Sequence, residues 1–215
     1  MSSPVENTGT AITKVATVVP MSAAQRESTH PFTARIALGW MRPWQFPVMG
    51  LLVAAAIYSF GPVPGILTAV WLALVSPALC LIDLRVHRLP NVLVVPGFMT
   101  LAADLAWWWA AAGDAPWAAL VGAVVVGALL LVANLAGVLG MGDVKLAVVQ
   151  AGCLGLVSPY LVTVSLMLAL LAGGVVSAVL LVQRRADRRS RMPFGPFLIA
   201  GFWAAAVCAV GARSI

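Results

Sequence analysis

Carboxyl groups are the side chains of this sequence that are best placed for chemistry, because the chain has few of them and sets three against apolar segments. Only seven of its 215 residues are acidic. Asp83, Asp104 and Asp143 border or interrupt apolar segments, where an ionisable group is costly and therefore a candidate for function. The other four lie in polar segments or turns and are interpreted as solvated charges: Glu6, Glu27, Asp114 and Asp187.

Asp83 and Asp143 could act together as an acid–base pair. Two carboxyl groups brought together near a low-dielectric boundary cannot both ionise easily, so they share a proton. The ionised carboxylate can then take a proton from water while the protonated one donates to a substrate carbonyl. No other catalytic set competes, because the sequence has no GxSxG or HExxH motif and no nucleophile stands beside His30 or His87.

Asp83 also has a structural interpretation. It ends an apolar segment, where the negative end of the helix dipole gives it no capping role, and it could pair with Arg85 or Arg88 as an interfacial charge. Asp104 lies well inside its apolar segment, roughly 18 Å from the start at 1.5 Å per residue. We expect it to face a polar crevice or the outer interface, and no chemistry is assigned to it.

Asp143 could be a helix N-cap, because it precedes an apolar run. Gly140 and Gly142, two glycines in three residues, indicate more than a cap, since they let backbone or substrate approach closely. Lys145 is interpreted as a cation that extends along the membrane surface or faces phosphate.

The composition predicts an all-α, polytopic membrane helix bundle. Apolar residues make up 62% of the chain and charged residues 9%, with a mean hydropathy of +1.01. A soluble domain carries roughly 25% charged residues. Because the chain has too few charged residues to form a water-exposed protein surface, its outer face must contact the lipid bilayer. The basic run at 184–191 then predicts a loop facing anionic lipid rather than a nucleic-acid site.

Two regions are predicted. Residues 1–45 are read as a disordered cytoplasmic tail, and 46–215 as a membrane-embedded domain. A spanning helix needs about 20 apolar residues, so about seven transmembrane helices are expected, three of them short. The expected segments are 46–60, 65–82, 92–112, 117–139, 144–157, 160–182 and 196–211.

The basic residues predict the orientation. With the N-terminus in the cytoplasm, the turns at 83–91, 140–143 and 183–195 share that side and carry almost all of the remaining Lys and Arg. Asp83 and Asp143 then lie at the cytoplasmic ends of even-numbered helices, at similar depth. No cofactor and no metal are expected, because Cys80, Cys153 and Cys208 lie in apolar segments without CxxC spacing.

Three ordered motifs resemble those of the type IV prepilin peptidases, a family of GxGD intramembrane aspartic proteases. Asp83, separated by six residues from Pro90-Asn91, resembles the first aspartate motif. Gly140-Met141-Gly142-Asp143 is similar to the GxGD motif and continues through Val144-Lys145-Leu146, and a third segment runs from Pro193 to Phe197. The resemblance covers about residues 50–205.

The resemblance implies a metal-independent aspartic endopeptidase of the bacterial inner membrane. Its substrates would be prepilin or pseudopilin precursors, cut at the cytoplasmic face to release a basic leader peptide. Asp83 and Asp143 would be the catalytic pair, with either as the base. The residues implied to contact the substrate are Gly140, Gly142, Pro90, Asn91, Lys145, Phe194 and Gly195.

The chain departs from the larger family members, which carry a cysteine-rich segment and methylate the new N-terminus. It has no paired CxxC motifs, so we expect cleavage without methylation, as in short forms that serve Flp or tight-adherence pili. Two alternatives stay open: a non-catalytic membrane component of a pilus or secretion assembly, and an ion-coupled transporter. A transporter is expected to place its acids near the bilayer midplane, in paired halves.

Overall fold

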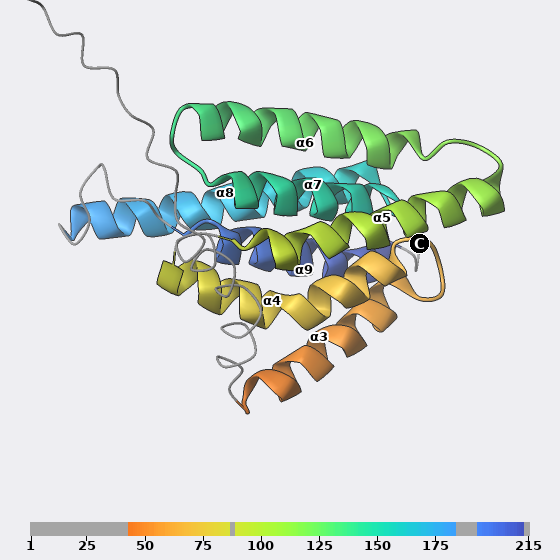
Figure 1. Ribbon diagram of the computed structural model, residues 1–215, viewed down its shortest axis with the longest axis horizontal. Helices are drawn as coiled ribbons and strands as arrows, with labels where there is room; N and C mark the ends of the chain where they lie inside the picture. The colour runs from red at the N-terminus through yellow and green to blue at the C-terminus, as the bar shows by residue number, and fades with distance from the viewer. Residues whose placement is uncertain (1–42, 87–88, 184–192, 213–215) are drawn as a thin grey trace, which may run out of the picture. The chain divides into compact units, whose positions relative to one another are not determined.

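The computed structural model describes residues 43–86, 89–183 and 193–212. Helices form this part of the chain, so the all-α fold class is confirmed (Figure 1). The helices are α3 (Gln45–Phe60), α4 (Ile66–Val86), α5 (Asn91–Ala112), α6 (Trp117–Leu135), α7 (Met141–Gly155), α8 (Pro159–Val182) and α9 (Gly195–Ala212). The tail predicted at 1–45 lies almost wholly outside the described residues.

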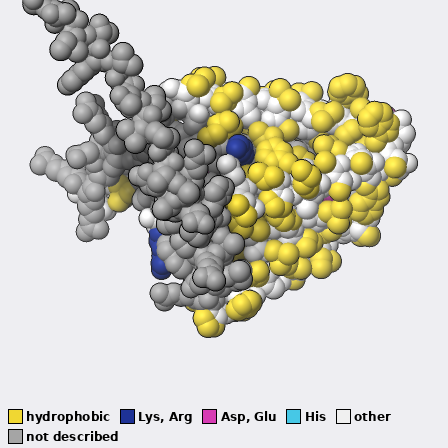
Figure 2. All heavy atoms as spheres, in the orientation of Figure 1, with side chains coloured by type: hydrophobic (Ala, Val, Ile, Leu, Met, Phe, Trp, Pro, Cys, Tyr) yellow, Lys and Arg dark blue, Asp and Glu magenta, His cyan; other side chains and the backbone are white. Residues whose placement is uncertain are grey.

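The protein is a multi-pass membrane protein. Within the described ranges, α4, α5, α6 and α8 are long and apolar enough to cross a bilayer, and α3 and α9 are shorter apolar helices. Large hydrophobic side chains remain exposed along α6 and α8. Hydrophobic side chains also cover much of the described part of the face seen in Figure 2. Such a surface suits lipid rather than water.

Helix α7 lies at the centre of the bundle. From Asp143 to Gly155 it is buried except at Lys145 and Val148, and it packs against α5, α6, α8 and α9. A Cβ at Gly155 would lie 2.6 Å from the Ala119 Cα, so this glycine is what lets α6 and α7 approach closely. The central helix is therefore insulated from lipid by its neighbours, which accounts for its short and less apolar sequence.

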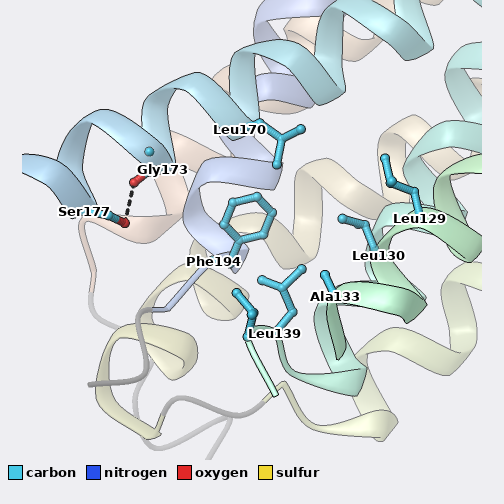
Figure 3. A pocket seen from close by; sticks show the side chains of 10 residues that line it. Leu129, Leu130, Ala133, Leu139, Leu170, Gly173, Ser177 and Phe194 are labelled. Carbon is cyan, nitrogen blue, oxygen red and sulfur yellow. Dashed lines mark hydrogen bonds between the residues drawn. The ribbon is translucent and has the colours of Figure 1, made fainter. Parts of the chain in front are cut away.

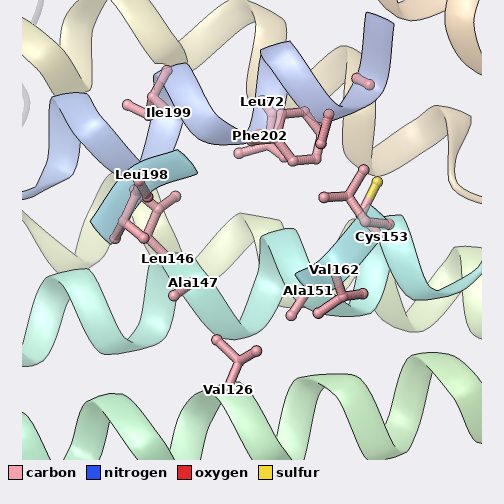
Figure 4. Packing of buried hydrophobic residues seen from close by; sticks show 14 of the residues in the cluster. Leu72, Val126, Leu146, Ala147, Ala151, Cys153, Val162, Leu198, Ile199 and Phe202 are labelled. Carbon is pink, nitrogen blue, oxygen red and sulfur yellow. The ribbon is translucent and has the colours of Figure 1, made fainter. Parts of the chain in front are cut away.

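The core links the two halves of the chain. Phe202 of α9 stacks on Phe60 of α3, with ring centroids 6.3 Å apart. Figure 4 shows Phe202 beside Leu72 of α4, and Leu198 of α9 above Leu146 of α7. These contacts hold α4, α7 and α9, the three helices that bear on the site, in one cluster of buried residues.

Helix boundaries at one end of the bundle differ from those expected. Helix α6 ends at Leu135 rather than at 139, because Gly137 adopts a left-handed conformation with φ 77°. Helix α7 begins at Met141 rather than at 144, with Gly140 at its N-cap. Asp143 is therefore in the first turn of α7, and the interpretation of Asp143 as the N-cap residue is wrong.

Asp104 stabilises the fold. Its Oδ2 accepts hydrogen bonds from the Thr68 backbone N–H at 2.8 Å and from the Thr68 hydroxyl at 2.7 Å, and Oδ1 accepts from the Leu67 N–H at 3.4 Å. Those N–H groups belong to the first turn of α4 and have no partner inside the helix. Asp104 is fully buried, so it caps α4 from α5 and does not face a crevice or the interface.

Candidate active site

Asp83 and Asp143 meet at one end of the bundle, although 60 residues separate them in the sequence. Asp83 lies in the last turn of α4 and Asp143 in the first turn of α7; 3% and 6% of their surfaces are exposed. A Cβ placed on Gly195 would be 2.8 Å from Asp83 Oδ2 and 3.5 Å from Asp143 Oδ1. The two oxygens can be no farther apart than the sum of those distances. The two carboxyl groups therefore border the same space beside Gly195.

Gly195 connects α9 to the carboxyl pair. Its backbone N–H donates to Asp83 Oδ2 at 2.9 Å, in a buried hydrogen bond between residues 112 positions apart. This N–H begins α9, so it would otherwise lack a partner, and it lies at the positive end of the helix dipole. A side chain at position 195 would occupy the space of the Asp83 carboxylate, which explains why a glycine stands there.

Asp143 is held by the turn that precedes it. Its Oδ2 accepts from the Gly140 N–H at 3.3 Å, while the Asp143 N–H donates to the Gly140 carbonyl at 3.1 Å. Asp143 Oδ1 is buried and has no hydrogen-bond partner within the described part of the chain. Buried polar atoms are rarely left unpaired, and the exceptions often mark functional positions.

Gly142 brings the chain that follows Asp83 onto the first turn of α7. A Cβ at Gly142 would lie 2.6 Å from Leu89 Cβ and 3.2 Å from the Leu89 carbonyl oxygen. Only a residue without a side chain permits this approach. Pro90 follows directly and is the N-cap of α5, in an extended conformation with ψ 131°. The glycine therefore serves packing between backbone segments, one of the two uses expected from the sequence.

A polar cavity of about 400 Å³ opens beside the carboxyl pair. Asp83 and Asp143 line it, and Lys145 and Asn91 form part of its wall, where Lys145 Nζ donates to Asn91 Oδ1 at 3.0 Å. Asn134 lines it from α6 and donates through Nδ2 to the Leu139 carbonyl at 2.8 Å. The cavity is large enough for several residues of an extended peptide beside the carboxyl groups.

The structure groups most of the residues singled out in the sequence. Six of them line the polar cavity, Gly195 contacts Asp83 from α9, and Pro90 lies at the start of α5 next to Asn91. Phe194 lines a neighbouring apolar cavity instead. Sequence reasoning missed Leu89, Asn134 and Leu139, although a lone Asn near the end of an apolar segment was a signal for Asn134. The six predicted residues that line the polar cavity are Asp83, Asn91, Gly140, Gly142, Asp143 and Lys145.

No cluster of three His, Cys, Asp or Glu side chains within the described ranges could hold a metal ion. Fold and site together define a multi-pass membrane helix bundle with a buried carboxyl pair in a polar cavity at one end. The model of the type IV leader peptidase family matches residues 66–182, more than half of the chain, and spans both aspartates. The chain therefore belongs to this family and is a membrane peptidase. No curated protein and no solved structure matched it.

Proposed function

We propose that this protein is an aspartic endopeptidase that cuts the leader peptide from prepilin or pseudopilin precursors at the cytoplasmic face of the bacterial inner membrane. The observation that carries the proposal is the convergence of two buried carboxyl groups, Asp83 and Asp143, on the same point beside Gly195. Family membership and the charge pattern of the sequence support the substrate class and the orientation.

The environments of the two carboxyl groups support different roles. Asp83 accepts the 2.9 Å hydrogen bond from the first N–H of α9, and such donors favour a carboxylate. Asp143 has one longer bond, at 3.3 Å from Gly140, and an unpartnered Oδ1 facing the same point as Asp83 Oδ2. A proton on Oδ1 turns that atom into a donor. We therefore assign Asp83 as the base and Asp143 as the acid.

The reaction then needs only water and the two carboxyl groups. Asp83 takes a proton from water while the water oxygen attacks the scissile carbonyl carbon, and Asp143 donates its proton to the carbonyl oxygen. The resulting tetrahedral diol breaks its C–N bond, and the proton held by Asp83 passes to the leaving amine. Asp143 recovers its proton from the hydroxyl of the diol as the new carboxyl group forms. The pair ends with one proton, as it began.

The other residues of the cavity are proposed to hold the substrate in an extended form. Lys145 and Asn91 supply a cation and an amide on its wall, which suit backbone carbonyls of the peptide. Gly140 leaves room beside Asp143, Gly142 lets Leu89 pack against the first turn of α7, and Gly195 keeps the point between the two carboxyl groups free of a side chain. Pro90 is the N-cap of α5.

Cleavage without methylation is proposed as well, on the absence of paired CxxC motifs from the sequence. The test is to co-express the chain with a prepilin, isolate the processed product and determine the mass of its first peptide. We expect a shortened product with an unmodified N-terminal amine. A product that is 14 Da heavier at that amine, roughly the mass of one added CH₂, would overturn the methylation part alone. An unprocessed prepilin, tried with several precursors, would overturn the peptidase proposal.

A further inference from the structure

A second cavity lies directly beside the polar one and is apolar. It measures about 380 Å³ and separates α6 from α8 at the end of the bundle that holds the carboxyl pair. Figure 3 shows Leu129 and Ala133 of α6 on one side, Leu170 of α8 on the other, and the Phe194 ring between the two helices. Apart from Ser177, whose hydroxyl donates to the Gly173 carbonyl at 2.7 Å, its lining is hydrophobic or glycine.

The same seam between α6 and α8 is hollow farther along. A third cavity, of about 370 Å³, has Val121 and Val125 of α6 on one wall and Val162 and Met167 of α8 on the other. Each helix lines both cavities with residues three or four positions apart, the spacing of one helix face. These residues are 118, 121, 122, 125, 126, 129, 130 and 133 on α6, and 159, 162, 163, 166, 167, 170, 173, 174 and 177 on α8.

The two helix faces have the spacing of a surface on which a further helix could pack. Side chains at such spacing form ridges and grooves that accept a third helix. The hollow face of α6 runs from Ala118 to Ala133, roughly 22 Å at 1.5 Å per residue, which is most of the ~30 Å hydrocarbon thickness. Val121, Val125 and Leu129 stay more than half exposed along it. We call this surface the α6–α8 groove.

The α6–α8 groove leads into the active site. Leu139 lines both the apolar cavity and the polar cavity that holds Asp83 and Asp143. Phe194, at the end of the groove, is followed directly by Gly195, the residue that donates to Asp83. A chain lying in the groove would therefore reach the carboxyl pair without crossing another element.

Resting on the proposed function, we propose that the α6–α8 groove holds an apolar helix of the substrate, joined directly to the peptide bond that is cut. The occupant lies at membrane depth, where a backbone must satisfy its own hydrogen bonds, so it is a helix rather than an extended strand. Its residues facing α6 and α8 are apolar, and it unwinds at the Phe194 end, where the polar cavity can receive an extended peptide. The groove thereby selects substrates by their membrane segment.

The chain offers a matched pair of variants. Gly174 of α8 lines the groove, Gly50 lies on α3 and lines none of the three cavities, and a Cβ at either would meet nothing within 4 Å. Gly174→Leu fills the groove, whereas Gly50→Leu makes the same change elsewhere. Each protein would be reconstituted with a full-length prepilin and with a version truncated a few residues beyond the cut. Cleavage of the truncated version measures the activity of the carboxyl pair on a substrate that lacks the apolar helix.

We expect Gly174→Leu to lower kcat/KM for the full-length prepilin by roughly tenfold and to leave kcat/KM for the truncated version unchanged. Gly50→Leu should match wild type on both. Full-length cleavage at the wild-type rate by Gly174→Leu would overturn the proposal and indicate a groove that holds only lipid. An equal loss on both substrates would also overturn it, because the change would then act through the carboxyl pair or the fold.

A crosslinking measurement tests the groove without cleavage. A photoreactive residue in place of Leu129 is expected to crosslink to the apolar segment of the full-length prepilin in the Asp143→Asn background, whereas the same residue in place of Leu51, exposed on α3, is not. Wild-type protein that cleaves neither substrate would refute the proposed function. Crosslinking from Leu129 no stronger than from Leu51 would refute the groove.

Discussion

Gly195 gives a prediction whose size follows from the structure. An added Cβ would lie 2.8 Å from Asp83 Oδ2 and 3.2 Å from its Cγ, and non-bonded carbon and oxygen do not approach so closely. In Gly195→Ala the carboxylate or the start of α9 must therefore move by several tenths of an ångström. The 2.9 Å hydrogen bond from the residue 195 N–H to Asp83 lengthens as a result.

The expected effect is on the chemical step. A misplacement of about 1 Å can cost on the order of 100-fold in rate, so a shift of about half that size is expected to lower kcat roughly tenfold. KM should stay close to the wild-type value, because Gly195 does not line the polar cavity whose wall carries Lys145 and Asn91. Steady-state cleavage of a prepilin in reconstituted vesicles separates the two constants.

Gly50→Ala is the matched control, since it adds the same methyl group to a helical glycine with open space around it. It should keep the wild-type kcat. Gly195→Ala with an unchanged kcat would refute the geometry that places the N-terminus of α9 against Asp83. A rise in KM at constant kcat would instead assign Gly195 to substrate binding.

Three further changes test other parts of the account. Asp104→Asn removes the carboxylate that caps α4, so the free energy of unfolding should fall by about 1–3 kcal/mol, seen as a lower Tm in detergent. The folded fraction should keep its wild-type kcat. An unchanged Tm would argue against the cap. Gly142→Ala places a Cβ 2.6 Å from Leu89 Cβ, so the loop before α5 must shift, and both Tm and kcat should fall; wild-type values for both would show that this backbone contact is dispensable. Lys145→Met removes the hydrogen bond to Asn91 and the cation on the cavity wall, so KM should rise about threefold at constant kcat. A lower kcat with constant KM would instead place Lys145 in the chemical step.

The helices and the paired aspartates could be predicted from the sequence for separate reasons. Apolar segments of spanning length, broken by Gly, Pro and charged residues, predict the seven described helices with ends that differ by at most four residues. Asp83 follows the second expected segment and Asp143 follows the fourth, so both are predicted at one end of the bundle, because alternate helices run in opposite directions. The sequence does not predict that the two carboxyl groups come close together, because this depends on how α4, α7 and α9 pack.

Other contacts of the site could not be read from the sequence. The hydrogen bond from Gly195 to Asp83 joins residues 112 positions apart, and the cap from Asp104 to Thr68 joins residues 36 apart. Local patterns carry no information about such pairs. The boundary at Asp143 was wrong for a local reason, since Gly140 takes the N-cap position although it has no side chain to accept a bond, and the Asp143 carboxylate reaches back to it.

The α6–α8 groove could not be predicted from the sequence for a related reason. The sequence predicts α6 and α8 only as spanning helices, because both are strongly apolar. Only their packing on α7 leaves the two faces hollow next to each other.

The central claim is that Asp83 and Asp143 form one catalytic unit. The most direct measurement is single-turnover cleavage of a prepilin by purified wild type, Asp83→Asn, Asp143→Asn and the double variant, each checked for folding by its Tm. Each single variant is predicted to lose cleavage as completely as the double variant, because neither carboxyl group can act without the other. A folded single variant that cleaves at a rate near that of wild type would contradict the claim.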